Sequence, residues 1–434
     1  MQIRHGHLST KKIFVFWLPL AATWLMMSVE GPFLAALIAR LAEPKYNLAA
    51  YGVAFSFALI IEAPIIMIMS ESTKLVKDAQ SFIILRRFTY GLNWLITLFM
   101  LVILIPPIFY FITEDLIGLP SKVSNLTYLA TIILLPWPGA IGYRRFYQGI
   151  LIRNDLTRRV AYGTVIRLTT MALTALLIYL FTDAAGVVVG ATSISAAVLL
   201  EAVASRFMAD RIIKKIMKQE GDDKDVLTYK EIYKFYYPLA LTSIVGLGVQ
   251  PVVIFFMGQS RMAIESLAVL PVVTSFVFIF RALGLSYQEV VIALMGDDKK
   301  NFTLLRNFAY SLGAVLTIVL VMVAFTPLSD IWFRVVSGLS ENLAEFARLP
   351  LMIMSILPFL TVLISLQRAA LVSKKTTQPI TISTAIEFIT IVLVLFISIK
   401  YIGLVGAVAA TSSFVIGRLA ANIYLTPPVI KSIK

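Results

Sequence analysis

Apolar runs long enough to cross a membrane recur along almost the whole chain. Charged residues and clusters of Gly or Pro separate these runs from one another. A helix needs roughly 20 apolar residues to cross a bilayer, so the pattern predicts about twelve spans. Their approximate limits are 13–39, 48–72, 88–112, 125–150, 160–181, 185–206, 233–258, 265–295, 303–326, 346–370, 379–400 and 403–424. The predicted fold class is therefore an all-α polytopic membrane protein.

The composition agrees with this prediction and excludes a soluble chain of several domains. Of the 434 residues, 59% are hydrophobic and 14% are charged, whereas charged residues make up about a quarter of a typical soluble domain. The chain has no Cys, and its two His residues, His5 and His7, lie in the N-terminal tail. These counts exclude a disulfide framework, an iron–sulfur site and a Cys–His zinc site, so we expect no metal and no cofactor.

Membrane topology explains the net charge of +14. Lys and Arg gather at both termini and in alternate segments between the spans, such as 74–87, 144–159, 206–234 and 299–306. By the positive-inside rule these segments face the cytoplasm. We therefore predict a multi-pass protein of the plasma (inner) membrane with both termini cytoplasmic, and we expect no nucleic-acid partner. The first apolar run is too long for a cleaved signal peptide.

The longest polar stretch, 207–232, divides the chain into six spans and six spans. It mixes Lys214, Lys215 and Lys218 with Glu220 and Asp222. We interpret it as a solvated cytoplasmic linker; the alternative is a regulatory or lipid-headgroup role for its basic part. The predicted domains are an N-terminal six-helix lobe, 1–206, and a C-terminal six-helix lobe, 233–434.

The two halves of the chain resemble each other in sequence. At an offset of 219 the identical pairs include Pro19 and Pro238, Pro32 and Pro251, Leu48 and Leu267, and Ser56 and Ser275; an offset of 220 aligns Pro138 with Pro358 and Ile166 with Ile386. Because each half has an even number of spans, both halves keep the same orientation, and the symmetry axis runs along the membrane normal. Two pseudo-symmetric six-helix lobes around a central cleft are typical of secondary transporters that work by alternating access.

Ionisable residues deep in a span are costly, and each is by default a candidate for function. The candidates for substrate binding or ion coupling are Glu30, Glu62, Arg167, Arg281 and Glu387. At the offset of 219 Glu62 corresponds to Arg281, and at 220 Arg167 corresponds to Glu387. We expect each pair to form or exchange ion pairs across or beside the central cavity, where losing one partner costs about 3–5 kcal/mol. The alternative is that each charge is satisfied inside its own half and fixes helix packing.

Glu30 precedes Gly31 and Pro32 in the first span. Pro32 removes a backbone hydrogen bond and Gly31 loosens the helix, so Pro32 and its counterpart Pro251 are predicted helix-kink residues. A carboxylate beside freed carbonyl groups is a candidate proton or sodium site. The alternative is that Glu30 caps its own kinked helix or faces the extracellular mouth.

Other residues receive a structural interpretation. Glu71, Glu201, Glu289 and Arg418 lie close enough to predicted span ends to reach the membrane interface. Prolines 136, 138 and 358 are expected to kink the fourth and tenth spans.

Several protein classes are excluded by what the sequence lacks. It has no GxxxxGK[ST] phosphate loop and no Gly-Lys dipeptide, so it carries no ATPase of its own. The acidic runs 222–225 and 297–298 lack the spacing of the paired metal–diphosphate motif of an intramembrane prenyl transferase. The sequence also lacks a cluster of carboxylates or histidines at one depth, which an intramembrane enzyme of another kind would need. We therefore expect no catalytic residue and no enzyme activity.

At segments 17–21, 48–52, 146–152, 157–167 and 403–411 the chain resembles the MATE-like (multidrug, oligosaccharidyl-lipid and polysaccharide) transporter and flippase superfamily. The stretches Tyr51 to Ser56 and Gln148 to Leu151 are similar to the progressive ankylosis (ANK) branch in particular. The resemblance implies two six-helix lobes with a V-shaped cleft and export by alternating access. In this superfamily the extruders carry an acidic coupling residue in the first span, where Glu30 lies, and ANK proteins are associated with export of anionic metabolites such as citrate and pyrophosphate.

Together these observations predict a secondary active transporter that exports a small organic solute, anionic rather than cationic, coupled to a proton or sodium gradient. Arg167 and Arg281 favour an anion, whereas Glu62 and Glu387 would equally meet a cation. The alternatives are a multidrug organic-cation antiporter using H+ or Na+, a lipid-linked oligosaccharide flippase and, from another class, an intramembrane enzyme. The expected partners are the small-molecule substrate, the coupling ion (H+ or Na+) and the lipid bilayer, and the chain is compatible with a monomer.

Overall fold

The computed structural model describes residues 8–154, 156–219, 227–295, 299–374, 376 and 378–433. These residues form helices, with one isolated β-bridge between Arg261 and Val405. Within these described residues, ten helices are long and apolar enough to span a membrane, or up to 12 when each of two bent helix pairs counts as one span. The predicted all-α polytopic fold class is confirmed.

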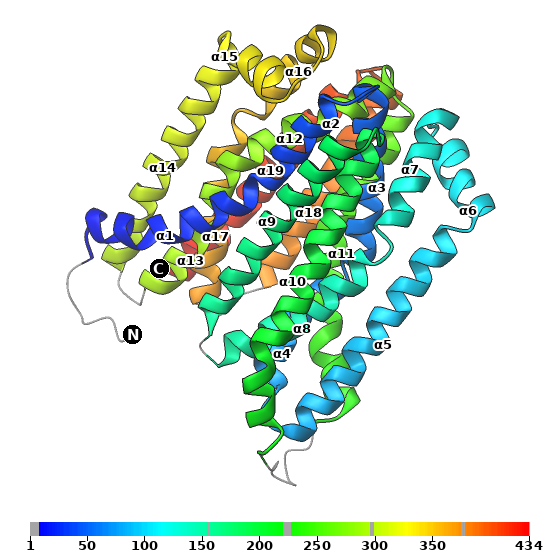
Figure 1. The fold of residues 1–434 in the computed structure, drawn as a ribbon. Helices are drawn as coiled ribbons and strands as arrows, with labels where there is room; N and C mark the ends of the chain where they lie inside the picture. The colour runs from blue at the N-terminus through cyan, green and yellow to red at the C-terminus, as the bar shows by residue number, and fades with distance from the viewer. Residues whose placement is uncertain are drawn as a thin grey trace. The chain divides into compact units, whose positions relative to one another are not determined.

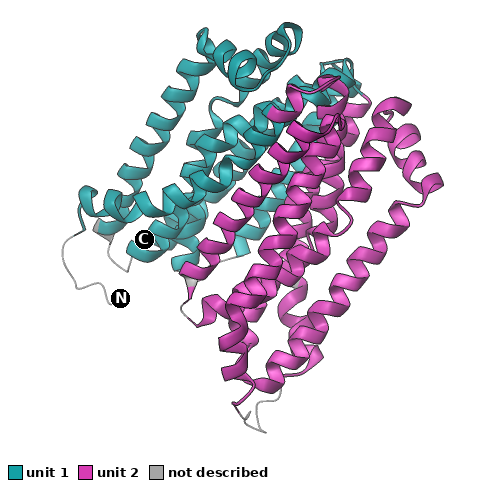
Figure 2. Ribbon diagram, in the orientation of Figure 1, with its two compact units in different colours: residues 1–36, 260–434 teal, residues 37–259 magenta. Residues whose placement is uncertain are grey.

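The chain forms two compact units, coloured teal and magenta in Figure 2. Unit 1 comprises residues 1–36 and 260–434, and unit 2 comprises residues 37–259. The helices are labelled in Figure 1. Those of unit 1 are α1 (Thr10–Ser28), the first part of α2 (Glu30–Ala39), α12 (Ala263–Leu285), α13 (Tyr287–Leu294), α14 (Lys299–Phe325), α15 (Leu328–Asp330), α16 (Glu341–Met354), α17 (Leu357–Ser373), α18 (Gln378–Lys400) and α19 (Gly406–Ile433). Those of unit 2 are the end of α2, α3 (Pro44–Glu62), the 3-10 turn Ile65–Met67, α4 (Ile68–Leu75), α5 (Ala79–Ile103), α6 (Pro106–Tyr110), α7 (Ser121–Ile133), α8 (Trp137–Arg153), α9 (Thr157–Phe181), α10 (Gly186–Ile216) and α11 (Tyr229–Gly258).

The compact units exchange the first and seventh spans relative to the lobes 1–206 and 233–434 expected from the sequence. In unit 1, Trp17 of α1 donates a hydrogen bond from Nε1 to Ser286 Oγ at 2.9 Å, and its ring packs against Phe308 of α14. In unit 2, Tyr236 of α11 donates from its hydroxyl to the carbonyl of Pro64 at 2.8 Å. The side chains of these two spans therefore pack with helices from the other half of the sequence.

The internal repeat appears in the helix bounds themselves. The first residues of α1 and α11 are 219 residues apart, and so are the first residues of α3 and α12. Both ends of α8 lie 220 residues before the corresponding ends of α17. The π-helical turns Phe111–Leu116 and Ile331–Val336 also differ by 220 residues. Left-handed backbone conformations recur in the same register, at Glu43 and Met262 before α3 and α12, and at Gly118 and Gly338. The two halves therefore have helix ends, π-helical turns and left-handed residues at corresponding positions.

Two of the predicted spans bend sharply within the described residues. The span expected at 48–72 bends by 59° between Glu62 and Ile65, and the one expected at 88–112 bends by 76° between Ile103 and Pro106. Proline at these breaks removes a backbone donor. The expected kinks of the fourth and tenth spans fall where α8 begins at Trp137 and α17 begins at Leu357.

The stretch expected as a linker, 207–232, is partly helical. Helix α10 continues ten residues past its predicted end at 206, to Ile216. Asp210 joins successive turns there, because it pairs with Arg206 at 3.1 Å and with Lys214 at 2.8 Å. Helix α11 begins after Thr228, whose hydroxyl accepts from the backbone N–H of Glu231 in a capping box. The acidic residues of the linker, Glu220, Asp222, Asp223 and Asp225, lie outside the described residues.

Candidate functional site

Unit 2 holds a buried cluster of charged side chains on α8, α9 and α10. Its centre is Glu201, which is 1% exposed and lies midway along α10. Arg144 of α8 donates to Glu201 Oε2, and Gln148, one turn further along α8, donates to Oε1 at 3.1 Å. Arg167 of α9 forms an ion pair with the same carboxylate, with 3.5 Å between Nε and Oε2. One carboxylate therefore serves two guanidinium groups.

Glu62 belongs to the surroundings of this cluster. It is the last residue of α3 and is buried at the break in the second span. Its Oε2 accepts a hydrogen bond from Trp137 Nε1 at 2.5 Å. The nearby charges of Arg144, Arg145 and Arg167 act on its carboxylate. Three arginines and two glutamates thus interact within unit 2, which leaves an excess of positive charge.

Unit 1 holds a second cluster on α17, α18 and α19. Glu387 of α18 accepts from Arg418 Nε of α19 at 2.8 Å. Arg368 of α17 approaches the other carboxylate oxygen of Glu387 at 3.9 Å and donates to Thr384 at 3.2 Å. Again one carboxylate serves two guanidinium groups.

Arg281 of α12 adds a third arginine to this cluster. Its Nε donates to Thr361 Oγ1 at 3.2 Å, and the charges of Arg418 and Glu387 act on its guanidinium group. The unit 1 cluster therefore contains three arginines and one glutamate. Both clusters carry more positive than negative charge inside helices long and apolar enough to span a membrane.

The two clusters occupy corresponding helices with inverted polarity. In unit 2 the arginine is on α9 and the glutamate on α10, as Arg167 and Glu201. In unit 1 the glutamate is on α18 and the arginine on α19, as Glu387 and Arg418. In the repeat, α9 corresponds to α18 and α10 to α19. Each half therefore has an ion pair between the same two helices, but the positive and the negative residue have exchanged helices.

The structure places four of the five predicted charged residues in these clusters. Glu62 and Arg167 belong to the unit 2 cluster, and Arg281 and Glu387 to the unit 1 cluster. Each has a partner from its own unit, which matches the alternative in which charges are satisfied inside their own half. The predicted pairs of Glu62 with Arg281 and of Arg167 with Glu387 stay predictions for another state of the protein.

The remaining predicted residues lie outside the clusters. Glu30 is the first residue of α2, directly after α1 ends, and a carboxylate is favourable at a helix N-terminus. Pro32 is the third residue of α2 and cannot donate to the carbonyl of Ser28, the last residue of α1. Pro251 lies inside α11, which is assigned as one continuous helix.

Six members of the clusters were not predicted from the sequence as site residues: Arg144, Arg145, Gln148, Glu201, Arg368 and Arg418. From the sequence, Arg144 is expected in a cytoplasmic basic segment, and Glu201 and Arg418 are expected at the membrane interface. A usable signal was present, because a charge deep in a span requires a partner at similar depth. For Arg167 and Glu387, that requirement indicates partners on the next helix along the chain, which is α10 for Arg167 and α19 for Glu387.

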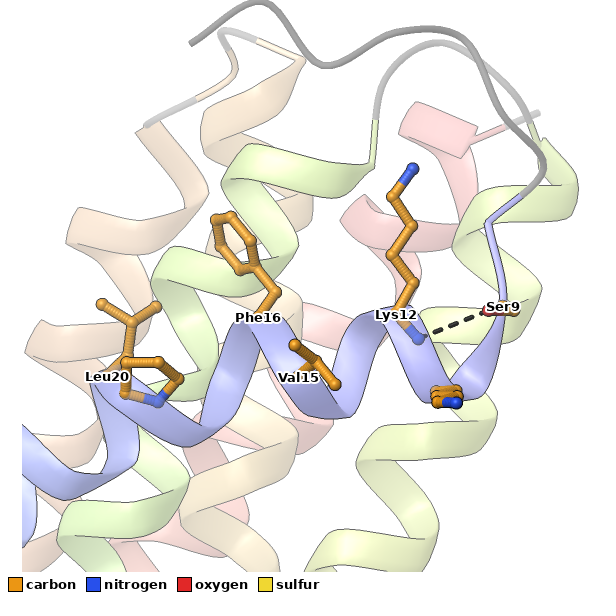
Figure 3. Close-up of a pocket in the computed structure, with 7 residues that line it drawn as sticks. Ser9, Lys12, Val15, Phe16 and Leu20 are labelled. Carbon is orange, nitrogen blue, oxygen red and sulfur yellow. Dashed lines mark hydrogen bonds between the residues drawn. The ribbon is translucent and has the colours of Figure 1, made fainter.

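A cavity of about 660 Å³ borders the first half of α1 and is separate from the clusters. Its lining consists of Ser9, Lys11, Lys12, Val15, Phe16, Pro19 and Leu20. In Figure 3 the side chains of Lys12, Phe16 and Leu20 project from one side of the helix, and Ser9 accepts a hydrogen bond from the backbone N–H of Lys12 at 3.3 Å. The buried glutamates and arginines described above do not contribute to this lining.

Solved structures with a similar fold are transporters and a flippase. An inward-facing multidrug resistance MATE family transporter of the MOP superfamily superposes with a TM-score of 0.75 at 14% identity, over 95% of this chain and 98% of that chain. The lipid II flippase MurJ, in an inward closed conformation, gives 0.70 at 17% identity, over 96% and 89%. An outward-facing MATE family transporter gives 0.65 at 14% identity, over 98% and 96%.

Comparison at the sequence level gives no match: neither a family model nor a curated protein matches the chain. The structural likeness nevertheless covers nearly the whole length of each protein. The chain therefore has the MATE-like fold, in agreement with the predicted fold class. Its place in the ANK branch stays a prediction.

Proposed function

We propose that this protein is a secondary active transporter that exports a small organic anion by alternating access. It acts in the plasma (inner) membrane, with both termini in the cytoplasm, and couples export to a proton or sodium gradient. The observation that carries the proposal is the excess of arginine over glutamate in both buried clusters.

An arginine excess favours an anionic substrate for two reasons. A positive charge in a low-dielectric interior is costly unless an anion compensates it. The planar guanidinium group also binds carboxylates and phosphates through two parallel hydrogen bonds. Arg281 suits this role, since its Nε donates to the neutral hydroxyl of Thr361 rather than to a carboxylate. Citrate and pyrophosphate represent the carboxylate and phosphate classes.

Glu30 is the proposed coupling residue. It starts α2 at the junction with α1, where Pro32 leaves a backbone carbonyl without its helical donor. A carboxylate beside such a carbonyl offers oxygen ligands to Na+ or a site for H+. The bound cation would enter and leave as α1 and α2, the two segments of the first span, change conformation.

The fold is shared with a multidrug transporter and with a flippase, so the test must separate three substrate classes. Purified protein is reconstituted in liposomes that hold a pH or sodium gradient, and flux of citrate, pyrophosphate and a lipophilic organic cation is measured. The matched variants are Glu30→Gln and, as a control, Glu341→Gln, which removes an exposed carboxylate paired with Arg334.

The proposal expects gradient-driven flux of at least one anion, lost in Glu30→Gln and kept in Glu341→Gln. Flux of the organic cation alone would overturn it in favour of a multidrug antiporter. Absence of flux for all three solutes, with scrambling of a lipid-linked oligosaccharide across the same liposomes, would overturn it in favour of a flippase.

A further inference from the structure

Unit 1 contains a cavity of about 500 Å³ between α14, α17 and α19, away from the charged cluster around Glu387. Most of its lining is apolar and includes Phe302, Leu363, Ile430 and Ile433. Tyr310 and Ile430 line the cavity and are also 46% and 53% exposed. Since exposed apolar surface on a membrane-spanning helix contacts lipid, the cavity is open to the bilayer.

An unsatisfied buried acceptor lines this cavity. Gln367 is 5% exposed, and its Oε1 has no hydrogen-bond partner among the described residues. Its Nε2 donates to the carbonyl of Asn422 and to Thr426 Oγ1, both at 3.1 Å. Exchanging the amide N and O would set Oε1 against the Asn422 carbonyl, two acceptors, so the orientation is fixed. A ligand in the cavity that donates a hydrogen bond would satisfy Gln367 Oε1.

Arg306 supplies a positive charge to the same cavity and has no ion-pair partner among the described residues. It lies seven residues after Lys299, the start of α14, and Gln367 lies six residues before Ser373, the end of α17. At 1.5 Å per residue, both groups are about 9–11 Å from their helix ends. These ends belong to the face predicted as cytoplasmic. Arg306 and Gln367 therefore lie at similar depth, within reach of lipid phosphates and glycerol groups.

The corresponding place in unit 2 is built differently. At the offset of 220, Arg306 corresponds to Arg86 and Tyr310 to Tyr90, but Gln367 and Thr426 correspond to Tyr147 and Arg206. There the Tyr147 hydroxyl is hydrogen-bonded to that of Tyr90 at 2.9 Å, and Arg206 lies over the Tyr147 ring at 5.4 Å. The polar atoms that Gln367 leaves open in unit 1 are thus satisfied in unit 2, which provides an internal control.

We propose that the cavity between α14, α17 and α19 binds one phospholipid of the cytoplasmic leaflet, with an anionic phosphate and a hydroxyl-bearing headgroup. The phosphate pairs with Arg306, a headgroup hydroxyl donates to Gln367 Oε1, and an acyl chain follows the apolar wall past Leu363, one turn further from the cytoplasmic end of α17. This inference does not depend on which solute the protein transports.

The test is a lipid titration of the full chain in detergent, followed by native mass spectrometry. The probes are phosphatidylglycerol, phosphatidic acid and phosphatidylcholine with identical acyl chains, and free glycerol phosphate. The variants are Arg306→Gln, Gln367→Leu and, as the matched control, Arg86→Gln. Circular dichroism and thermal unfolding establish that each variant is folded.

Phosphatidylglycerol is expected to bind more tightly than phosphatidylcholine, and Arg306→Gln to weaken it about fivefold or more, as for loss of one basic contact near a membrane surface. Gln367→Leu should abolish the preference for phosphatidylglycerol over phosphatidic acid, and Arg86→Gln should change neither. Equal affinity for all three lipids, or equal loss in Arg306→Gln and Arg86→Gln, would overturn the proposal. Displacement of the lipid by free glycerol phosphate would identify a solute site instead.

Discussion

Arg167 and Glu387 occupy corresponding positions of the repeat, and each is ion-paired with a residue of its own unit. Arg167 contacts Glu201 of α10, and Glu387 contacts Arg418 of α19. The pairing between adjacent helices is therefore kept in the two halves while the signs of the charges are exchanged. Variants of one cluster can therefore be designed from the arrangement of charges found in the other.

Glu201 is expected to be the most sensitive residue of the unit 2 cluster. Glu201→Gln keeps the shape of the side chain but leaves Arg144 and Arg167 without their carboxylate. Breaking a buried ion pair from one side should lower the free energy of unfolding by about 3–5 kcal/mol. Denaturant unfolding in detergent measures this. Glu341→Gln, at an exposed pair, should cost less than about 1 kcal/mol, and equal losses in the two variants would contradict the assignment.

Exchange of the charges in unit 1 should be partly tolerated. Glu387→Arg and Arg418→Glu each place like charges together, so each single variant should be destabilised. The double variant restores an opposite pair with the polarity found on α9 and α10 of unit 2. A coupling energy of about 0.5–3 kcal/mol in favour of the double variant is expected from a double-mutant cycle. If the loss of unfolding free energy in the double variant equals the sum of the losses in the two single variants, the two residues do not interact.

Trp137 is expected to hold Glu62 in place. Trp137→Phe keeps most of the ring volume but removes the donor to Glu62 Oε2, which leaves a buried carboxylate oxygen unsatisfied. The expected loss is about 1–3 kcal/mol of unfolding free energy. Trp94→Phe is the control, because Trp94 is 76% exposed. A loss confined to the control would refute the role given to Trp137.

Gly149 is required by the close approach of α8 to α4. A Cβ atom there would lie 2.4 Å from the Met69 carbonyl oxygen, a backbone atom that cannot rotate away. Gly149→Ala should therefore destabilise the protein by about 1–3 kcal/mol. At Gly91, on α5, an added Cβ meets nothing within 4 Å, so Gly91→Ala should be neutral or mildly stabilising. The two thermal unfolding midpoints compare the sites directly.

The fold could be predicted from the sequence because its main features repeat locally. Apolar runs gave the spans, and Pro19, Pro32 and Pro138 recur in the second half as Pro238, Pro251 and Pro358. The bends after Glu62 and Ile103 were not predicted, since the length of an apolar run does not show whether the helix is straight or bent. The exchange of the first and seventh spans was also hidden, because it depends on contacts such as Trp17 with Ser286, far apart in the sequence.

The candidate site was predicted in part. Glu62, Arg167, Arg281 and Glu387 stood out as charges inside apolar runs. A sixth span that ends at 206 places Glu201 near the membrane interface, whereas α10 runs to Ile216 and places Glu201 at its middle. Which partner satisfies each charge depends on helix packing, and hydropathy carries no information about it.

Anion flux through an Arg281 variant shows whether the arginine-rich clusters bind an anionic substrate. Citrate and pyrophosphate flux is measured in proteoliposomes for the wild type, for Arg281→Gln and for Arg334→Gln, whose exposed arginine pairs with Glu341. We expect Arg281→Gln to lower anion flux at least about tenfold, equivalent to about 1.4 kcal/mol, and Arg334→Gln to leave it unchanged. Unchanged anion flux in folded Arg281→Gln, or a loss of the same size in Arg334→Gln, would contradict this expectation.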